Sequence, residues 1–462
     1  MAATNRILVL TATSIGALIN PLLSTMLILA MPAIGDLFSV SVRDLGWLST
    51  AFILANAVCL VPGAWFVDRF GYKKSFITGC IISAISCILA IFSPSYPVLI
   101  ASRIITGAGI SLCMITSIAI LTRIFPKNKR GFVIGINTAM VYVGLSIGPV
   151  LGGFLTEFFG WQSLFIFVPP VVLSGALIMG LFLKEEFTEP VEKFDKVGAL
   201  LYAFALVSLM YGLSTITDNG SIFFVIAGLL LGAVFVWYEL RQKAPILHIR
   251  LFFENKRFAR SSYAALLNYA AAYSVTYMVS LYLQSVGALS ALQAGLVMLF
   301  MPVVQVITTP VAGKLADRID PKYLVTIGMI LTIAGLITLA ALGFFGTEFI
   351  TYIAGAQLLM GLGASLFSAP NTTAIMSSVP KKEYSTASGV VAVVRQAGML
   401  LSMAICMASI SFIVGGAEML GPAMHAEFIS AMQAAMLISA GLAVIGVFFS
   451  WFRGALPEEV EE

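Results

Sequence analysis

The residues best suited to chemistry lie in a short charged turn at residues 63–74, between two apolar runs. Hydrocarbon does not solvate charges, so a turn this close to two membrane-spanning helices must lie in water at a membrane surface. Carboxylate and cationic groups there can form ion pairs and contact helix ends, which would hold that end of a helix bundle closed. The members that we expect to take part are Gly63, Asp68, Arg69, Gly71, Lys73 and Lys74.

A plainer interpretation of the same turn is topological. Basic residues at membrane ends anchor a membrane protein in one orientation, whatever else they do. This interpretation explains Lys73 and Lys74 better than it explains Asp68, whose negative charge opposes the rule.

A related turn at residues 313–322 repeats the Asp-Arg pair after one apolar run and before another. Its candidates for the same role are Gly313, Asp317 and Arg318. Repetition of a charged turn between apolar helices indicates an internally duplicated membrane protein.

Two cations lie inside apolar runs, where a guanidinium is costly unless it is paired or hydrated. Arg103 and Arg395 are therefore functional candidates, and we expect both to face a central cavity or to buttress it; snorkelling is the alternative for Arg103. Tyr273 belongs to a stripe with Tyr269 and Tyr277 that is more often helix packing than ligand contact. The polar side chains expected to line the cavity are Asn20, Asn137, Asn268, Tyr273, Gln305, Asn371 and Gln396.

The composition identifies the elements that must position these residues. The 462-residue chain is 60% hydrophobic and 10% charged, whereas globular proteins are about 25% charged. Apolar runs of about 20 residues recur along the chain, each long enough to cross about 30 Å of hydrocarbon. The sequence therefore predicts an all-α polytopic membrane protein. The net charge of +4 lies in short loops, so we expect no nucleic-acid partner.

The apolar runs can be divided into fourteen transmembrane spans, and the two Asp-Arg turns fall at equivalent places in two sets of six. The predicted spans are about 7–31, 44–66, 75–93, 97–122, 132–156, 162–183, 197–217, 221–241, 259–283, 291–312, 323–344, 350–377, 385–414 and 429–452. The predicted parts are an N-terminal six-helix half at 1–184, cytoplasmic loops with two additional helices at 185–258, a C-terminal six-helix half at 259–453 and an acidic cytoplasmic tail at 454–462.

Lysine and arginine residues set the predicted orientation. With the amino terminus inside, 23 of the 26 fall in cytoplasmic segments, and Arg43 alone lies outside. We therefore expect a multi-pass protein of the cell membrane with both termini in the cytoplasm. The loop at 184–196 carries charges of both signs and should be solvated, and a basic cluster at 256–260 precedes the ninth span. The five cysteines show no CxxC spacing, so we expect neither a disulfide framework nor a metal site.

Glycines in the fifth span form a third pattern. Gly144, Gly148 and Gly152 recur every four residues, with Pro149 and Gly153 beside them. Such a stripe lets helices approach closely, and a proline removes one backbone hydrogen bond and can kink the helix. Ordinary small-residue packing is the alternative explanation.

These motifs resemble those of the major facilitator superfamily, in its fourteen-helix drug:proton antiporter branch. The resemblance covers the full length and rests on the turn at 63–74, on Arg103 with Gly107 in the fourth span, and on the fifth-span glycines. Ala64 departs from the first glycine of the family's turn, and Asp320 replaces the second glycine in the later copy. The resemblance implies a major-facilitator-type fold, a cytoplasmic gate at the Asp-Arg turns, coupling through Arg103 and an antiporter motif.

The acidic residues depart from the family pattern. All 22 can be assigned to loops or helix ends, and Leu23 stands where many relatives carry an aspartate. Carboxylates at membrane depth are the usual proton carriers and the usual partners of cationic drugs. Arginines in the spans instead favour a neutral or anionic ligand. Coupling to a proton gradient is therefore a hypothesis.

The sequence predicts a secondary active transporter, not an enzyme, that exports small amphipathic organic compounds by alternating access, as multidrug efflux proteins do. We expect it to act as a monomer in the lipid bilayer without a cofactor. The first alternative is an importer or facilitator of a small anionic metabolite that uses Arg103 and Arg395. The second, a membrane-embedded enzyme or sensor, is disfavoured by short loops that carry no catalytic cluster.

Overall fold

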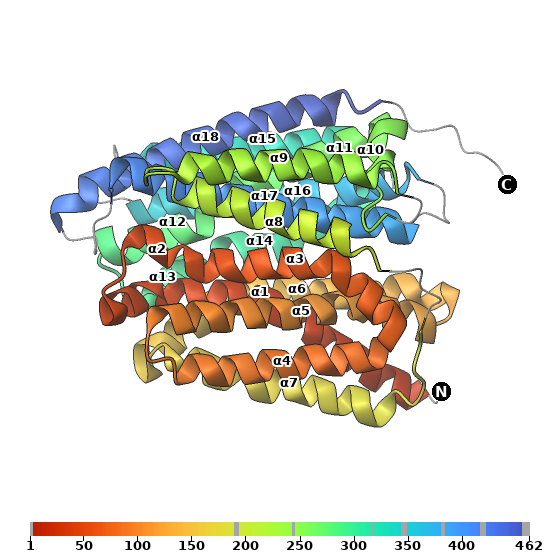
Figure 1. Ribbon diagram of the computed structural model, residues 1–462. Coiled ribbons are helices and arrows are strands. Elements are labelled where there is room, and N and C mark those ends of the chain that lie inside the picture. Colours follow the sequence, from red (N-terminus) through yellow and green to blue (C-terminus); the bar gives the residue numbers. More distant parts are fainter. Residues whose placement is uncertain are drawn as a thin grey trace. The chain divides into compact units, whose positions relative to one another are not determined.

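The computed structural model describes residues 3–188, 194–242, 245–316, 318–342, 349–379, 384–415 and 422–454. Within these ranges every regular element is a helix, as the composition predicts (Figure 1). The helices group into two compact units.

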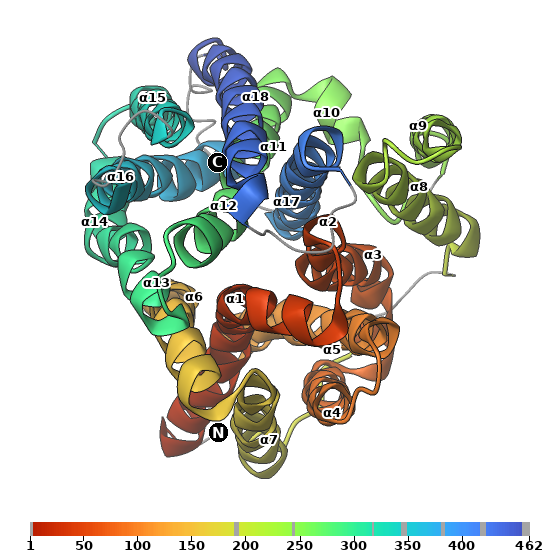
Figure 2. The same cartoon turned by 90° about the vertical axis from the view of Figure 1, so that its left-hand side faces the viewer.

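The first unit takes in the described residues of Met1–Ala199 and Leu283–Leu299. Its helices are α1 (Ala3–Phe38), α2 (Val42–Leu45), α3 (Trp47–Phe70), α4 (Tyr72–Ile91), α5 (Tyr96–Ile124), α6 (Lys127–Phe159), α7 (Gln162–Phe182) and α13 (Ala291–Val297). Long apolar helices pack in pairs, α1 against α6, α4 against both α5 and α7, and α3 against α5 (Figures 1 and 2). The short α13 joins this unit from far along the chain by packing against α6.

The second unit takes in the described residues of Leu200–Tyr282, Phe300–Gly416 and Leu420–Glu462. Its helices are α8 (Lys196–Ser214), which begins in the first unit, α9 (Ser221–Glu239), α10 (Arg250–Glu254), α11 (Lys256–Ala272), α12 (Val275–Leu281), α14 (Phe300–Ala316), α15 (Pro321–Ala340), α16 (Phe349–Met376), α17 (Tyr384–Ile413) and α18 (His425–Trp451), with a 3-10 turn at Pro422–Met424. A π-helix at Tyr282–Val286 begins at the last residue of the stretch Leu200–Tyr282 and continues into the first unit. Here α15 packs against α16 and α18, and α11 against α17 and α18.

The outward faces of these helices are apolar. Leu177, Phe223 and Ile307 are exposed on three different helices, where a soluble protein would carry charges. Lipid tails can take up this surface, because a helix that is apolar on all sides suits a membrane. The hairpin of α8 and α9 turns at Asp218-Asn219-Gly220, between the predicted spans 197–217 and 221–241, and Gly220 has a φ of 88°.

Thirteen helices in the described ranges are long and apolar enough to cross a membrane, so the predicted count of fourteen is not confirmed. The missing one is the predicted span 259–283, which the structure divides into α11 and α12. At the interruption the Ser274 N–H donates to the Ser402 hydroxyl, 2.9 Å away on α17. A side chain from a neighbouring helix thus satisfies a donor outside the helical hydrogen-bond pattern, which makes the break tolerable in an apolar setting.

Candidate functional site

Gly71 separates α3 from α4 in the first Asp-Arg turn. Its φ of 104° lies in the left-handed region, which favours glycine. The Gly71 N–H donates to the Val67 carbonyl at 2.9 Å, and the Tyr72 N–H donates to the Phe187 carbonyl at 3.0 Å. The turn is therefore fastened to the segment that follows α7.

Glu186, from the same segment, caps the start of α4. Its two carboxylate oxygens accept the N–H groups of Lys73 at 2.8 Å and of Lys74 at 3.2 Å. The first N–H groups of a helix lack partners within the helix, and a carboxylate also suits the positive end of the helix dipole. A Cβ at Gly71 would collide with the Glu186 side chain, so space as well as φ requires the glycine. Glu186 is partly exposed, so the predicted solvation of the 184–196 loop is compatible with this role, which the sequence did not predict.

The Asp68 carboxylate also has partners within the first unit. The Tyr72 hydroxyl donates to it, and the guanidinium carbon of Arg123, near the end of α5, lies 4.5 Å from the centre of the Tyr72 ring. The Lys73 ammonium donates to the Gly180 carbonyl in the last turn of α7 at 3.0 Å. Residues from α3, α4, α5 and α7 therefore meet around the turn.

The other predicted members of this turn make fewer contacts. Gly63 is buried in α3, while Arg69 and Lys74 are exposed. The Arg69 guanidinium carbon lies 5.6 Å from the centre of the Trp65 ring. Exposure of these two cations is what a topological anchor requires.

The second Asp-Arg turn, between α14 and α15, is built differently. Asp320 is the N-cap residue of α15, and its carboxylate accepts the Lys322 N–H at 2.9 Å. Arg318 is exposed, and Gly313 has open space where a Cβ would be. Asp317, the aspartate of the motif, lies outside the described residues.

Arg103 joins α5 to α3. The residue is 1% exposed, its Nε donates to the Leu48 carbonyl at 3.2 Å, and its guanidinium carbon lies 4.5 Å from the centre of the Phe52 ring. One turn later, a Cβ at Gly107 would meet the Phe52 carbonyl. A cation over an aromatic face and a close backbone contact thus hold these two helices together.

The fifth-span glycines form the face of α6 that contacts α1. A Cβ at Gly144 would lie 2.6 Å from the Leu18 carbonyl oxygen, and one at Gly152 would lie 2.5 Å from that of Met26. Between them, a Cβ at Gly148 would collide with the Thr25 hydroxyl. The two backbones therefore approach closely over more than two turns, as the glycine spacing predicts.

Another part of the same motif packs against α13, a contact that sequence reasoning missed. A Cβ at Gly295 would lie 2.5 Å from the Pro149 carbonyl oxygen, and one at Gly153 would meet the Ala291 carbonyl. The Glu157 carboxylate accepts the Leu292 N–H at 3.0 Å. No local signal links these segments, because they are far apart in the chain.

Asn20, a predicted cavity residue of the first unit, lies near the Met114 sulfur of α5. The Asn20 amide nitrogen is 2.9 Å from this weak acceptor, and the amide nitrogen of Asn56 on α3 is 3.6 Å from it. Asn137 is buried on α6. The amides of α1 and α3 thus meet at one side chain of α5.

The predicted cavity residues of the second unit fall on four helices. The Asn371 amide donates to the Ser261 carbonyl at 3.1 Å, which ties α16 to α11. Tyr273 stands at the end of α11, and Arg395 is half-buried on α17. The remaining members are buried, namely Asn268, Gln305 and Gln396.

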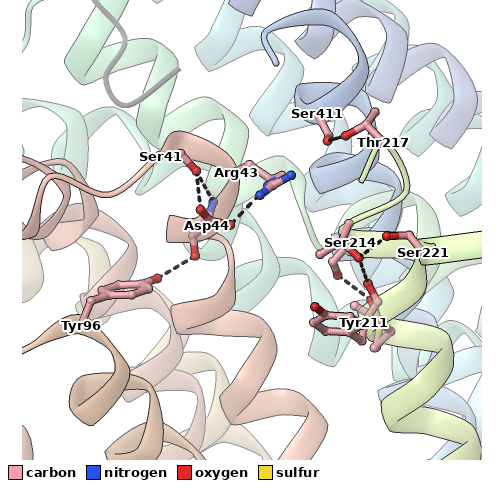
Figure 3. Close-up of polar contacts among 11 residues, drawn as sticks. Ser41, Arg43, Asp44, Tyr96, Tyr211, Ser214, Thr217, Ser221 and Ser411 are labelled. Atoms are coloured by element: carbon pink, nitrogen blue, oxygen red, sulfur yellow. Dashed lines mark hydrogen bonds and ion pairs between the residues drawn. The ribbon is translucent and has the colours of Figure 1, made fainter. Parts of the chain in front are cut away.

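Polar contacts also fasten helix ends in each unit separately (Figure 3). In the first, the Tyr96 hydroxyl donates to the Asp44 carbonyl at 2.6 Å, and the Arg43 Nε lies 3.2 Å from the Asp44 carboxylate. In the second, the hydroxyls of Thr217 and Ser411 bond to each other, which joins the α8–α9 turn to α17.

Comparison with known proteins gives a family match. The family model described as Major Facilitator Superfamily matches residues 13–403. The chain is 27% identical to the riboflavin transporter RibZ of Clostridioides difficile, over 86% of each chain. It is 28% identical to the multidrug resistance protein Stp of Mycobacterium tuberculosis, over 87% of this chain and 75% of that one.

A solved structure shares the fold. The chain resembles a bacterial homologue of the human lysosomal transporter Spinster, in an inward-facing and unoccupied conformation, with a TM-score of 0.70 and 18% identity. The match covers 98% of both chains. At this identity the likeness concerns the fold alone.

Proposed function

This chain belongs to the Major Facilitator Superfamily, and we propose that it exports small amphipathic organic compounds across the cell membrane by alternating access. The observation that carries the proposal is the glycine face of α6, which matches the antiporter motif and lies against α1. The relatives named as a multidrug resistance protein and a riboflavin transporter support an organic substrate of moderate size. Transporters of this kind bind substrate near the membrane midplane.

In this proposal, the glycine face allows α6 to move against α1. Where backbone meets backbone, two helices can slide or rock without side chains having to interdigitate again. Pro149 has no N–H, so the hydrogen-bond pattern of α6 is weakened beside Gly148. Replacing Gly148 by leucine should therefore block transport while leaving the protein inserted in the membrane.

The first Asp-Arg turn is the cytoplasmic gate in this proposal. Asp68, at the end of α3, would exchange partners between its Tyr72 contact and groups that become available when the gate closes. Alanine at Asp68 should impair transport without abolishing insertion. Wild-type flux in that variant would refute the gate.

The energy source is proposed to be a proton gradient, with carriers near helix ends. The acids of the candidate membrane helices all lie within three residues of a helix end, namely Asp36, Asp44, Asp68, Glu157, Glu239 and Glu427. Water reaches such positions more readily than the middle of a span, which suits proton exchange. The protein would act as a monomer without a cofactor, and both termini would lie in the cytoplasm.

Two measurements test the proposal. Expression in an efflux-deficient host should raise resistance to some members of a panel of amphipathic drugs. Inverted vesicles should then accumulate the identified compound faster when a pH gradient is imposed. Transport that ignores the gradient would rule out proton antiport, and a panel without any response, despite normal expression, would count against drug export.

A second candidate function is uptake or facilitation of a small anionic metabolite. The absence of acids from the helix interiors and the half-buried Arg395 favour it. Arg103 is already stacked on Phe52, so Arg395 would be the principal ligand. Right-side-out vesicles would accumulate the anion under this alternative, and Arg395→Gln would weaken binding more than the same change at an exposed arginine.

A further inference from the structure

Two buried arginines lie at one end of the second unit, near Asp320 of the second Asp-Arg turn. Arg453 follows α18 and is 1% exposed, and Arg257 lies in the first turn of α11 and is 6% exposed. Guanidinium groups are almost never this buried unless they are paired. The sequence shows only a basic cluster at 256–260 and one arginine just after the last predicted span, with no sign of burial.

Packing between the helices brings the two arginines into one neighbourhood. Arg260, one turn after Arg257, donates to the carbonyl of Phe452, the residue before Arg453. The Ser450 hydroxyl bonds to that of Thr326 at 2.9 Å, which fastens the end of α18 to α15. The ends of α11, α15 and α18 therefore converge here.

The hydrogen bonds of the two guanidinium groups are incomplete among the described residues. Arg453 donates from Nε and one Nη to the Ser450 carbonyl and hydroxyl, each at 2.9 Å. Its other Nη, and all three side-chain nitrogens of Arg257, have no acceptor within the described ranges. Four buried nitrogen donors therefore need an acceptor group that carries several lone pairs.

The nearby charge does not compensate for this. Asp320 is the carboxylate that interacts with both arginines, yet no ion pair within 4.0 Å joins it to either one in the described part of the chain. Its carboxylate already caps α15 through the Lys322 N–H. Burial, followed by the positive charge of Arg257, lowers the pKa of Arg453 to about 10, and Asp320 offsets only part of this shift.

We propose that Arg257 and Arg453 form a binding site for a phosphate group. The guanidinium fork matches phosphate oxygens in pairs, and a phosphate offers enough lone pairs for four donors. Basic pockets between membrane helices can take phosphate from a lipid headgroup, and free phosphate in water has the same chemistry. Occupancy would lock α11 to α18 at this end of the unit.

Thermal unfolding of the purified full-length protein in uncharged detergent tests the site. Inorganic phosphate, or short-chain phosphatidylglycerol, is titrated at constant ionic strength, with chloride and short-chain phosphatidylcholine as controls. We expect a saturable rise of the unfolding midpoint. Arg257→Gln should weaken the apparent affinity by roughly tenfold. Asp320→Asn should strengthen it several-fold, because a repelling carboxylate is removed while the helix cap is kept.

Arg241→Gln is the matched control, because Arg241 is exposed and its guanidinium carbon lies 4.1 Å from the centre of the exposed Trp237 ring. A response to phosphatidylglycerol alone would assign the site to a lipid headgroup, and a response to both ligands would assign it to phosphate in general. Equal responses in wild type and Arg257→Gln, or no response to either ligand, would overturn the proposal. If Arg257→Gln fails to fold, unchanged affinity in Asp320→Asn overturns it instead.

Discussion

The two Asp-Arg turns share a sequence pattern but stabilise the helix that follows them by different means. In the first, the cap of α4 comes from Glu186, a residue remote in sequence, and Gly71 leaves room for it. In the second, Asp320 stands at the position equivalent to Gly71 and caps α15 itself. Both solutions satisfy the first N–H groups of a helix. The departure of the second copy from the family pattern is therefore a change in the source of the cap.

The first turn is therefore built from several segments of the chain, whereas the second is stabilised by its own residues. The first turn depends on the segment after α7, on Arg123 of α5 and on Tyr72 of α4, so a movement of α7 would be transmitted to it. In the second turn, the acceptor for a first-turn N–H of α15 is Asp320, only two residues before the donor Lys322. A gate needs connections to elements that move, so the gate proposal rests on the first turn.

The largest expected effect is that of Gly71→Ala, which acts on the first turn directly. The φ of 104° is strained for alanine, and the new Cβ would collide with Glu186, so we expect a loss of about 2–3 kcal/mol of stability. The measurement is unfolding of the purified protein in detergent by denaturant. Gly313→Ala in the other turn should cause no loss of stability, because the space around Gly313 is open and alanine suits a helix better than glycine does. Equal losses in both variants would erase the distinction between the turns.

Glu186→Ala should come next, at about 1–2 kcal/mol, because two helix N–H groups lose their acceptors. Glu185→Ala, at the exposed neighbouring position, is the control and should stay within about 0.5 kcal/mol of wild type. The two changes at this turn should also be coupled. Gly71→Ala should cost less in the Glu186→Ala background, since the collision is gone. Strict additivity would contradict the contact.

Asp320→Ala tests the local cap of the second turn, and we expect a loss of about 1 kcal/mol. Asp320→Asn removes the same charge but keeps an N-cap side chain, so the difference between the two variants isolates the cap. Unfolding by denaturant measures both. Equal stability of the two variants would show that Asp320 acts through its charge and that the cap contributes little.

The fold class could be predicted from the sequence, because a chain with this many apolar runs can form only a few kinds of structure in a membrane. Apolar runs of spanning length must become helices, since each backbone group needs a partner within its own segment. The glycine spacing in α6 predicted that another helix would approach closely, because a row of small residues leaves room for a neighbouring backbone, but it did not identify α1 as that helix. The count of fourteen helices is not confirmed at the ninth predicted span, which is interrupted at Ser274. The partner of Ser274, Ser402, lies on a different helix, so no local sequence pattern predicts this interruption.

The parts of the site that escaped prediction are contacts between remote segments. In the sequence, Glu186 is one of several charged residues in a polar loop. Its contact with the first turn of α4 forms only when the chain folds. The charge count assigns Arg257 and Arg453 to the cytoplasmic side of the membrane, but it does not predict that both are buried. Charge counting gives the side of a membrane on which a residue belongs, but it cannot say whether water reaches that residue.

The smallest expected effect concerns Lys73, whose ammonium joins the first turn to the last turn of α7. It donates to the Gly180 carbonyl, where a cation suits the negative end of the helix dipole, but water competes for it at this partly exposed position. Lys73→Gln should therefore cost about 0.5 kcal/mol or less. Lys74→Gln should cost nothing measurable, because that side chain is exposed. If Lys73→Gln nonetheless lowers transport far more than Lys74→Gln, the link to α7 serves the movement of the gate; equal transport in the two variants would limit Lys73 to anchoring.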